Sequence, residues 1–492
     1  MAQYAYERLS FLDNSFLLME GPNTPMHVAG TASYEAGSLC SPEGGIDIDR
    51  IRAYVTSRLH LIPRYRQRLA WIPVENHPVW IDDDHFNIHY HVRHTALPRP
   101  GDERQLKRLA ARIMAQHLDR SKPLWELWVV EGLAGGDSFA IISKIHHCMV
   151  DGMSSVDLLN VLLQPEPVES FEPAPEWLPR PAPTSLGLLR DAAYRYAMLP
   201  IELARNIPEL IGEARDPRSD VRARMRAVRD TLSGLGRPSL TPLNQPIGPH
   251  RRFDWLAMDL GRVKDVKNRL GGTLNDIVLT TVAGAVRRFL SRRRVHPEHL
   301  DFRVMAPVSV RSQQEQGSLG NRVSAWMVPM PLEERDPRER LAKIRQTTAA
   351  LKDTKQAMGA EMLTAVGEWT PSTLLSLGAQ LATRRLPFNL VVTNVPGPQV
   401  PLYLLGARML DNYGLVPLMD NLCLGIVLFS YAGKLCWGFT SDWDLIPDLH
   451  DFVLDVEASF RELAELAPLE VAAEPTNGKG RRRAAEPVGA PA

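Results

Sequence analysis

Two adjacent histidines open the stretch HHCMVDG, in which His146 and His147 precede the pair Asp151-Gly152. An imidazole has an unperturbed pKa of about 6.5, so a large part of it is neutral at physiological pH and can accept a proton. Asp-Gly is a turn signal, because Asp can bond to nearby backbone and Gly adopts conformations that a side chain forbids. The pattern therefore fits a general base held at the end of an element, although a structural histidine beside a tight turn fits the same spacing.

The residues before the histidines predict the element that carries them. Residues 139–147 are rich in apolar and β-branched side chains and are expected to form a strand. Alternation along a strand places His147 on one face with Ser143 and Ile145, and His146 on the other face with Lys144. Only one of the two histidines can then face a given cleft.

Other chemistries have weaker support. Cys148 follows His147 directly, so a strand would direct its thiol away from that imidazole. The histidines in DDDHFNIHYHVRH have no accompanying cysteine or carboxylate spacing that would complete a metal site. The stretch from Gly136 to Ala140 lacks the final glycine of a nucleophile elbow. Neither type of glycine-rich nucleotide loop occurs, so we expect no metal and no bound cofactor.

Composition restricts the class of protein. The chain has 492 residues, of which 44% are hydrophobic, and this length favours two lobes over one core. Lys plus Arg and Asp plus Glu both total 57, a balance that gives no reason to expect a nucleic acid partner. The four cysteines are scattered, and neither a signal peptide nor an apolar run of membrane-spanning length is visible. These features predict a cytoplasmic protein.

Changes in composition divide the chain into four parts. Residues 1–165 and 251–470 mix strand-like and helix-like patterns, which predicts an α+β class with two lobes of similar size. Between them, residues 166–250 begin as a Pro-rich crossover and continue with helical spacing and the basic run 218–229, which indicates one or two amphipathic helices. Residues 471–492 are expected to be a disordered tail. Within the lobes, the pattern predicts helices over 104–117 and 274–289 and strands over 86–92, 127–131, 139–145, 390–393 and 422–429.

Several short blocks resemble a known family. The HHxxxDG pattern resembles that of the CoA-dependent acyltransferase superfamily, which includes chloramphenicol acetyltransferase and the condensation domains of peptide synthetases. The rest resembles the bacterial wax ester synthase/diacylglycerol acyltransferase family more narrowly. The blocks that carry this likeness, in order, are LSFLD with Phe16-Leu17 and Glu20, PMHV, LDRSKPLWE, Asn275-Asp276, PVSVR, Gly320-Asn321, NVPGP, SYAG and DWD. The likeness covers residues 7–465.

The resemblance implies a fold and a mechanism. It implies a chloramphenicol acetyltransferase-like fold with an active-site channel between the two lobes, and it implies that His147 is the general base, with His146 beside it in the motif. Asp151 and Gly152 would support the loop, with Asp151 paired to Arg311. Glu20, Trp125 and Asp276 would be motif positions that bind substrate or support the site.

The residues also suggest how the oxyanion is bound. Asn275 stands at the predicted start of a helix, where its amide and the helix dipole could stabilise a tetrahedral oxyanion. An N-terminal capping role for Asn275 fits the same position.

The family implies an O-acyltransferase that moves a long acyl chain from acyl-CoA, its cosubstrate, to diacylglycerol or a long-chain alcohol. Its substrates predict peripheral contact with a membrane or lipid inclusion, for which the basic amphipathic stretch from Leu186 to Arg229 is the expected surface. A non-catalytic lipid-binding relative and a condensation-type enzyme with another acceptor are the alternatives. The preferred acceptor, the acyl chain length and the oligomeric state cannot be derived from the sequence.

Overall fold

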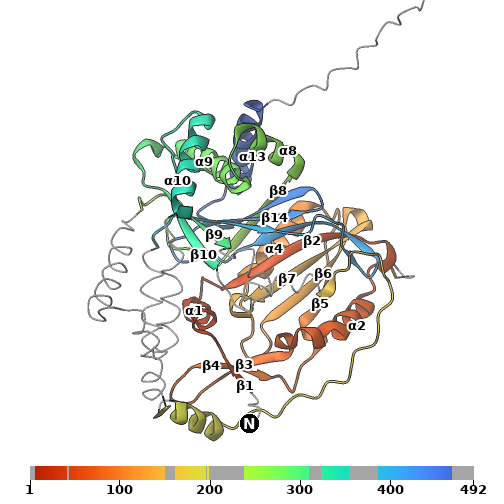
Figure 1. Cartoon of the computed structure of the whole chain (residues 1–492). Helices are drawn as coiled ribbons and strands as arrows, with labels where there is room; N and C mark the ends of the chain where they lie inside the picture. Colours follow the sequence, from red (N-terminus) through yellow and green to blue (C-terminus); the bar gives the residue numbers. More distant parts are fainter. Residues whose placement is uncertain are drawn as a thin grey trace, which may run out of the picture.

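The computed structural model describes residues 6–41, 44–149, 161–195, 197–198, 238–309, 323–353 and 386–467. Within these ranges, two six-stranded sheets and one three-stranded sheet account for the strands. Figure 1 shows the two large sheets next to each other near the middle of the molecule, with helices on their outer sides. No helix in the described ranges is both long enough and apolar enough to cross a membrane.

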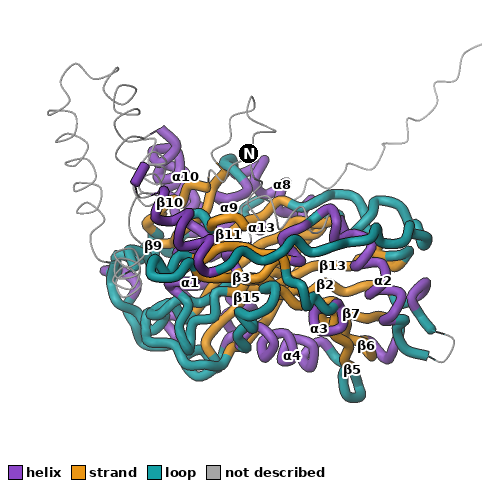
Figure 2. The backbone as a smooth tube through the Cα atoms, turned by 90° about the horizontal axis from the view of Figure 1, so that it is seen from below, coloured by secondary structure: helices purple, strands orange, loops and turns teal. Residues whose placement is uncertain are grey.

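The sheet of the first lobe has the strand order β12-β13-β2-β7-β6-β5. Figure 2 shows β13, β2, β7, β6 and β5 side by side. The strands are β2 (His27–Glu35), β5 (Val92–Ala96), β6 (Trp125–Leu133), β7 (Ser138–His146), β12 (Tyr403–Leu404) and β13 (Ala407–Leu415). Helix α2 (Ile48–Arg58) packs on one face through Ile51, Tyr54 and Val55, and α4 (Glu103–Ala115) packs on the other. Helix α1 (Phe11–Met19) contacts the turn after β7.

The sheet of the second lobe has the order β10-β9-β11-β14-β15-β8, and β11 is parallel to both of its neighbours. Its strands are β8 (Arg251–Asp259), β9 (Arg303–Ser309), β10 (Val323–Pro329), β11 (Leu390–Pro396), β14 (Leu424–Tyr431) and β15 (Lys434–Asp442). Its helices are α8 (Leu260–Leu270), α9 (Leu274–Arg292), α10 (Pro337–Asp353) and α13 (Leu449–Glu465). Helix α9 is buried along most of its length because it packs against both α10 and α13.

A small antiparallel sheet of β1 (Tyr6–Arg8), β4 (Pro78–Asp82) and β3 (Gln67–Trp71) extends the first lobe. A helix over 185–195 lies against it, and Leu188 and Ala192 of this helix join a small core with Val79 and Ile81. The Pro-rich stretch before this helix has no regular structure. The expected helices between 199 and 235, and the expected tail, lie outside the described residues.

The C-terminal segment of the chain contributes two strands to the sheet of the first lobe. Strands β12 and β13 come from the segment 251–470, yet β13 pairs with β2 of the first lobe over Leu415 to Met409. This pairing places Gly414 of β13 against Gly438 of β15. A β-carbon added to Gly438 would lie 2.0 Å from the Gly414 carbonyl oxygen. A separate core then forms between the lobes from α4, β8 and β13, with Trp255 stacked on Tyr413 at 4.8 Å. The lobes are therefore packed together and are not merely connected.

Most of the elements expected from periodicity are present. The expected helices correspond to α4 and α9, and the expected strands correspond to β6, β7, β11 and β14. The expected strand over 86–92 is wrong, because the short helix α3 (Ile88–His91) stands there and β5 begins only at Val92. Asn87 caps α3 by accepting a hydrogen bond from the His89 amide, which favours a helical turn over an extended backbone.

The contact between the two glycines predicts the effect of one methyl group. Gly438→Ala should destabilise the protein by about 2–3 kcal/mol, because the added carbon would collide with backbone that cannot rotate away. Gly37→Ala is the matched control, since no atom lies within 4 Å of a β-carbon at Gly37. Urea unfolding of both variants measures the difference, and equal stabilities would show that the sheets can separate locally at no cost.

Candidate active site

The two histidines lie where one element ends and the next begins. Strand β7 ends at His146, and His147 begins a 3-10 turn over His147–Met149. The amide of His146 donates to the Leu124 carbonyl at 3.0 Å, and that of His147 donates to the Met26 carbonyl at 2.8 Å. The expected strand is thus one residue too long at its end. The two imidazoles nevertheless have different neighbours, as the alternation predicted.

His147 lies against helix α1. Its ring stacks on Phe16 with the ring centroids 3.8 Å apart, and its Nδ1 is buried with no hydrogen-bond partner. Burial lowers the pKa of His147 to about 4, helped by the nearby charge of His146. The imidazole is therefore neutral at physiological pH, which is the form a general base requires.

His146 faces a buried carboxylate. Its Nδ1 accepts a hydrogen bond from the Cys148 amide at 3.1 Å, so the proton of a neutral ring must be on Nε2. That Nε2 lies 3.5 Å from Glu20 Oε1. The backbone on one side and Glu20 on the other fix the orientation of the His146 ring.

Glu20 is the centre of a network of cationic and neutral donors. Arg120 donates to Glu20 Oε2 through Nε at 3.1 Å and through a terminal nitrogen at 2.6 Å. His27 and His117 approach Oε1 at 3.5 and 3.4 Å. Burial raises the pKa of Glu20, but hydrogen bonds and positive charge from His146 and Arg120 outweigh burial and bring the pKa far below its ordinary value. The carboxylate therefore stays ionised under the catalytic turn.

Two further buried bases complete this face of the sheet. Burial and the positive charge of Lys144 lower the pKa of His27 well below its ordinary value. Burial lowers the pKa of Lys144 to about 8, while its ammonium group donates to the Gln116 carbonyl. Glu20 is thus the anion that balances a locally cationic environment.

Asn275 and Asp276 occupy the first turn of α9. The helix begins with a capping box between Thr273 and Asp276, so the expected N-cap role of Asn275 is wrong. Asp276 Oδ2 accepts from the Thr273 hydroxyl, and Asp276 Oδ1 accepts from the Thr348 hydroxyl at 2.7 Å. Asp276 therefore supports the first turn of α9. Asn275 Oδ1 accepts from the Asn394 amide at 2.7 Å, which leaves the Asn275 NH₂ group as its donor. Both asparagines line a cavity of about 130 Å³ in the second lobe.

Trp125 lies in the core of the first lobe. Its indole nitrogen donates to the Tyr65 carbonyl at 2.8 Å, and its ring stacks on His91 at 4.6 Å. His91 is therefore a core residue, and within the described residues no group of His, Cys, Asp and Glu is arranged to hold a metal ion. Cys148 lies in the turn and not in the strand that we expected. Burial raises the pKa of its thiol well above the ordinary value, so the thiolate is disfavoured.

Some expected site residues cannot be compared with the structure. Asp151, Gly152 and Arg311 lie outside the described residues. Conversely, sequence reasoning gave no role to Phe16, His27, Arg120 or Asn394, although each stands in one of the family-like blocks. Their membership of those blocks was the available signal. Within the described residues no hydrogen bond, ring contact or ion pair joins His147 to Asn275.

Comparison with solved structures shows which known proteins share this fold. The starter condensation domain of rhizomide synthetase shares the two-lobed fold. That domain, solved in complex with C8-CoA and Leu-SNAC, is 13% identical with a TM-score of 0.56, over 94% of each chain. The match to a wax ester synthase/diacylglycerol acyltransferase from Marinobacter aquaeolei VT8 is better. It has a TM-score of 0.64 at 26% identity and covers 94% of this chain and 100% of the other.

The sequence comparisons identify the family. Residues 9–278 match the wax ester synthase/diacylglycerol acyltransferase catalytic domain, and residues 319–464 match the C-terminal domain of the same family. A protein of Mycobacterium tuberculosis named as a diacylglycerol O-acyltransferase is 34% identical over 474 residues, which cover 94% of this chain and 91% of that protein. A second protein with that name, from the same organism, is 31% identical over 464 residues, or 93% and 96% of the two chains. The chain belongs to the wax ester synthase/diacylglycerol acyltransferase family.

The low pKa of His147 predicts the pH dependence of the reaction. If His147 acts as the base, its protonation stops the reaction, so kcat/KM should stay level from pH 8 to pH 6 and should fall about tenfold per pH unit only below about pH 4. Initial rates of coenzyme A release measure this, with circular dichroism to confirm that the protein remains folded. An acid limb centred near pH 6.5 would mean that His147 is solvated when it acts.

Proposed function

We propose that this protein transfers a long acyl chain from acyl-CoA to the hydroxyl group of diacylglycerol, of a long-chain alcohol, or of both. The observation that carries the proposal is the neutral imidazole of His147, whose Nδ1 is buried and whose ring stacks on Phe16, at the position where the family has its catalytic histidine. Membership of the family supports the reaction class, and the names of the relatives support diacylglycerol as an acceptor.

The proposed mechanism needs one base and no covalent enzyme intermediate. His147 accepts the hydroxyl proton through Nε2 while the hydroxyl oxygen attacks the thioester carbonyl carbon. The carbon–sulfur bond of the tetrahedral intermediate then breaks. The coenzyme A thiolate takes the proton back from His147, and the ester and free coenzyme A leave. A positioned base contributes about 10²–10⁴-fold, so substrate alignment and oxyanion stabilisation must supply the rest.

Other residues have supporting roles in this proposal. The NH₂ group of Asn275 is our candidate donor to the oxyanion, since its oxygen is already occupied by Asn394. Glu20 holds the ring of His146 and thereby keeps the turn that carries His147 in place. Asp151 and Arg311 are proposed to form an ion pair that braces the loop containing Gly152.

A non-catalytic lipid-binding relative remains the alternative, together with a condensation-type enzyme that uses another acceptor. A binding protein has no need for a buried neutral base in a supported turn, whereas an acyltransferase does. The condensation domains resemble this chain only in fold.

Thiol release from palmitoyl-CoA distinguishes these functions. Dipalmitoylglycerol and hexadecanol are offered in parallel to the wild type and to His147→Ala, which should lose at least about 10²-fold in kcat because the positioned base is absent. Cys148→Ser is the neighbouring control and should retain activity, since its thiol has no step in the mechanism. Release that is equal in wild type and His147→Ala would remove the base role, and no release with either acceptor would favour the binding protein.

We also propose that the protein lies on the surface of a membrane or a lipid inclusion in the cytoplasm. The helix over 185–195 buries Leu188 and Ala192 but leaves Leu186 76% exposed and Tyr194 65% exposed. The basic run 218–229 follows in the sequence. Exposed apolar side chains on a helix, together with a basic run further along the sequence, favour an anionic lipid surface.

Sedimentation with anionic vesicles tests this surface. Replacement of Leu186 and Tyr194 by Ser should lower the bound fraction severalfold, and so should neutralisation of Arg218, Arg222, Arg224, Arg226 and Arg229, since each change removes one component of the attraction. Leu240→Ser is the control, because Leu240 is 84% exposed and lies outside this helix. If all three variants bound like the wild type, the contact surface would have to lie elsewhere.

A further inference from the structure

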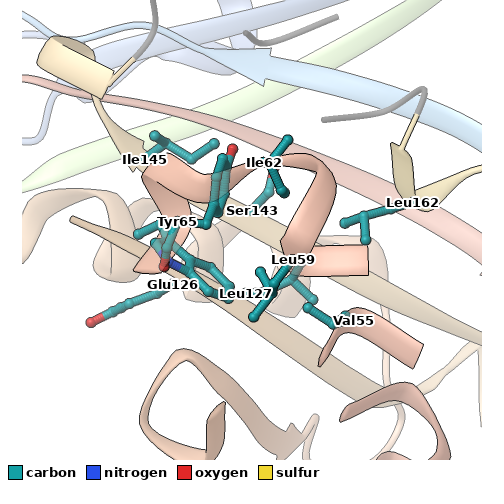
Figure 3. Close-up of a pocket in the computed structure, with 10 residues that line it drawn as sticks. Val55, Leu59, Ile62, Tyr65, Glu126, Leu127, Ser143, Ile145 and Leu162 are labelled. Atoms are coloured by element: carbon teal, nitrogen blue, oxygen red, sulfur yellow. The ribbon is translucent and has the colours of Figure 1, made fainter. Parts of the chain in front are cut away.

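A hollow lies between helix α2 and the sheet of the first lobe. Its part nearer the end of β7 is drawn in Figure 3, where Ser143 and Ile145 of the strand stand opposite Val55, Leu59 and Ile62. A second part, of about 50 Å³, continues towards β2 and β13. The two parts share four lining residues, Val55, Leu127, Ser143 and Leu162. The two parts, of about 10 and 50 Å³, therefore adjoin, and together we call them the α2 passage.

Small residues keep the α2 passage open. Three neighbouring positions on its floor are Gly30 and Ala32 on β2 and Ser143 on β7, and Gly30 is paired with Ser143. The space between a helix and a sheet is normally filled by large apolar side chains, and protein cores contain few voids larger than a water molecule. The small side chains at these three positions therefore leave a space under the apolar helix, which a single larger side chain would fill.

The passage is aligned with the catalytic turn. Ile141, Ser143 and Ile145 alternate along the face of β7 that packs towards α2, and Ile141 and Ile145 belong to the core on that side. His147 begins the turn directly after the strand and stacks on Phe16, which packs against the same core. At about 3.3 Å per residue, Ser143 is roughly 13 Å from His147 and Ile141 is roughly 20 Å away.

The lining is suited to hydrocarbon. Most of the lining side chains are aliphatic, and the Ser143 hydroxyl bonds to the Gly30 carbonyl of the adjacent strand. Glu126 borders the passage, but its carboxylate is paired with Arg93 at 3.0 Å and accepts from the Trp128 indole at 2.9 Å. The Ser143 hydroxyl and the Glu126 carboxylate thus already have partners in the protein, and an apolar ligand would not leave them unpaired.

We propose that the α2 passage receives the hydrocarbon chain of the acyl donor, with Ser143 and Ala32 determining the chain length that fits. This inference rests on the proposed function. Two adjoining hollows of this small volume suit a single unbranched chain. The donor brings one such chain whichever acceptor is used, whereas diacylglycerol brings two. The thioester carbonyl then lies beside His147, and the methyl end lies near β2. The aliphatic side chains Val55 and Leu162 move apart as the chain enters.

Two bulky substitutions at different depths test the proposal. Ser143→Leu blocks the passage near the base, and Ala32→Leu blocks it further in, since Ala32 pairs with Ile141 and Gly30 pairs with Ser143. Ser143→Leu should lower kcat/KM for palmitoyl-CoA at least tenfold and move the optimum to short donors, while Ala32→Leu should leave medium-chain donors unaffected. Ser143→Ala is the control, because it removes the hydroxyl group and leaves the space open.

Binding gives a measurement that does not depend on turnover. The non-reactive thioethers hexadecyl-CoA and octyl-CoA are titrated calorimetrically into the wild type and each variant, with thermal unfolding as a check on the fold. Selective loss of the long analogue, graded by depth, supports the proposal. Equal loss of both analogues, or a shift in alcohol chain preference with unchanged donor preference, overturns it. Wild type that binds hexadecyl-CoA through the passage but releases no coenzyme A from palmitoyl-CoA would refute the proposed function and leave the binding site standing.

Discussion

The contact between Gly414 and Gly438 is the constraint on which the arrangement of the two lobes depends. Strand β13 is hydrogen-bonded into the sheet of the first lobe, yet its backbone lies against β15 of the second-lobe sheet so closely that a β-carbon cannot be accommodated there. Two sheets can approach to this distance only where both lack side chains. The stacked rings of Trp255 and Tyr413 then fill the adjoining space. The surfaces of the two lobes are consequently held at a fixed separation, and this separation sets the width of any channel between them.

A second constraint acts within the first lobe. The buried side chains of His27 and His146 and the partly exposed Arg120 converge on one buried carboxylate, Glu20, with the buried Lys144 nearby. Burying charge costs free energy unless the charge is paired, so the network is stable only as a set. Its catalytic consequence is indirect. Glu20 orients His146, the Cys148 amide bonds to the same ring, and the turn that carries His147 is fixed as a result.

The two faces of β7 thus have different surroundings. One face carries Lys144 and His146 into the charged network under α4. The other carries Ser143 and Ile145 under α2 and leads to His147, where burial keeps the imidazole neutral. A strand makes this division possible because its side chains alternate between two faces. A charged support and an apolar approach to the base can therefore lie within a few residues of each other without mixing.

The sequence by itself determined the elements whose pattern is local. The helical period of α9, the apolar run of β14 and the paired histidines at the end of a strand could all be read from neighbouring residues. The short helix α3 was missed because one Asn87 cap outweighed a strand-like composition. The family-like blocks also marked Glu20 and Asn275 as residues of interest, but they did not show which residues these two contact.

Only the tertiary structure decided what those residues touch. Arg120 reaches Glu20 across 100 positions of sequence, and Asn394 reaches Asn275 across 119. The capping alternative for Asn275 is excluded for the same reason, because Thr273 is the N-cap and a distant strand supplies the amide that donates to the Asn275 oxygen. The pairing of β13 with the sheet of the first lobe also has no local signal in the sequence, since strand pairing depends on which sheet edge is available after the chain has folded. Periodicity is a property of neighbours in sequence, whereas a site is made of neighbours in space.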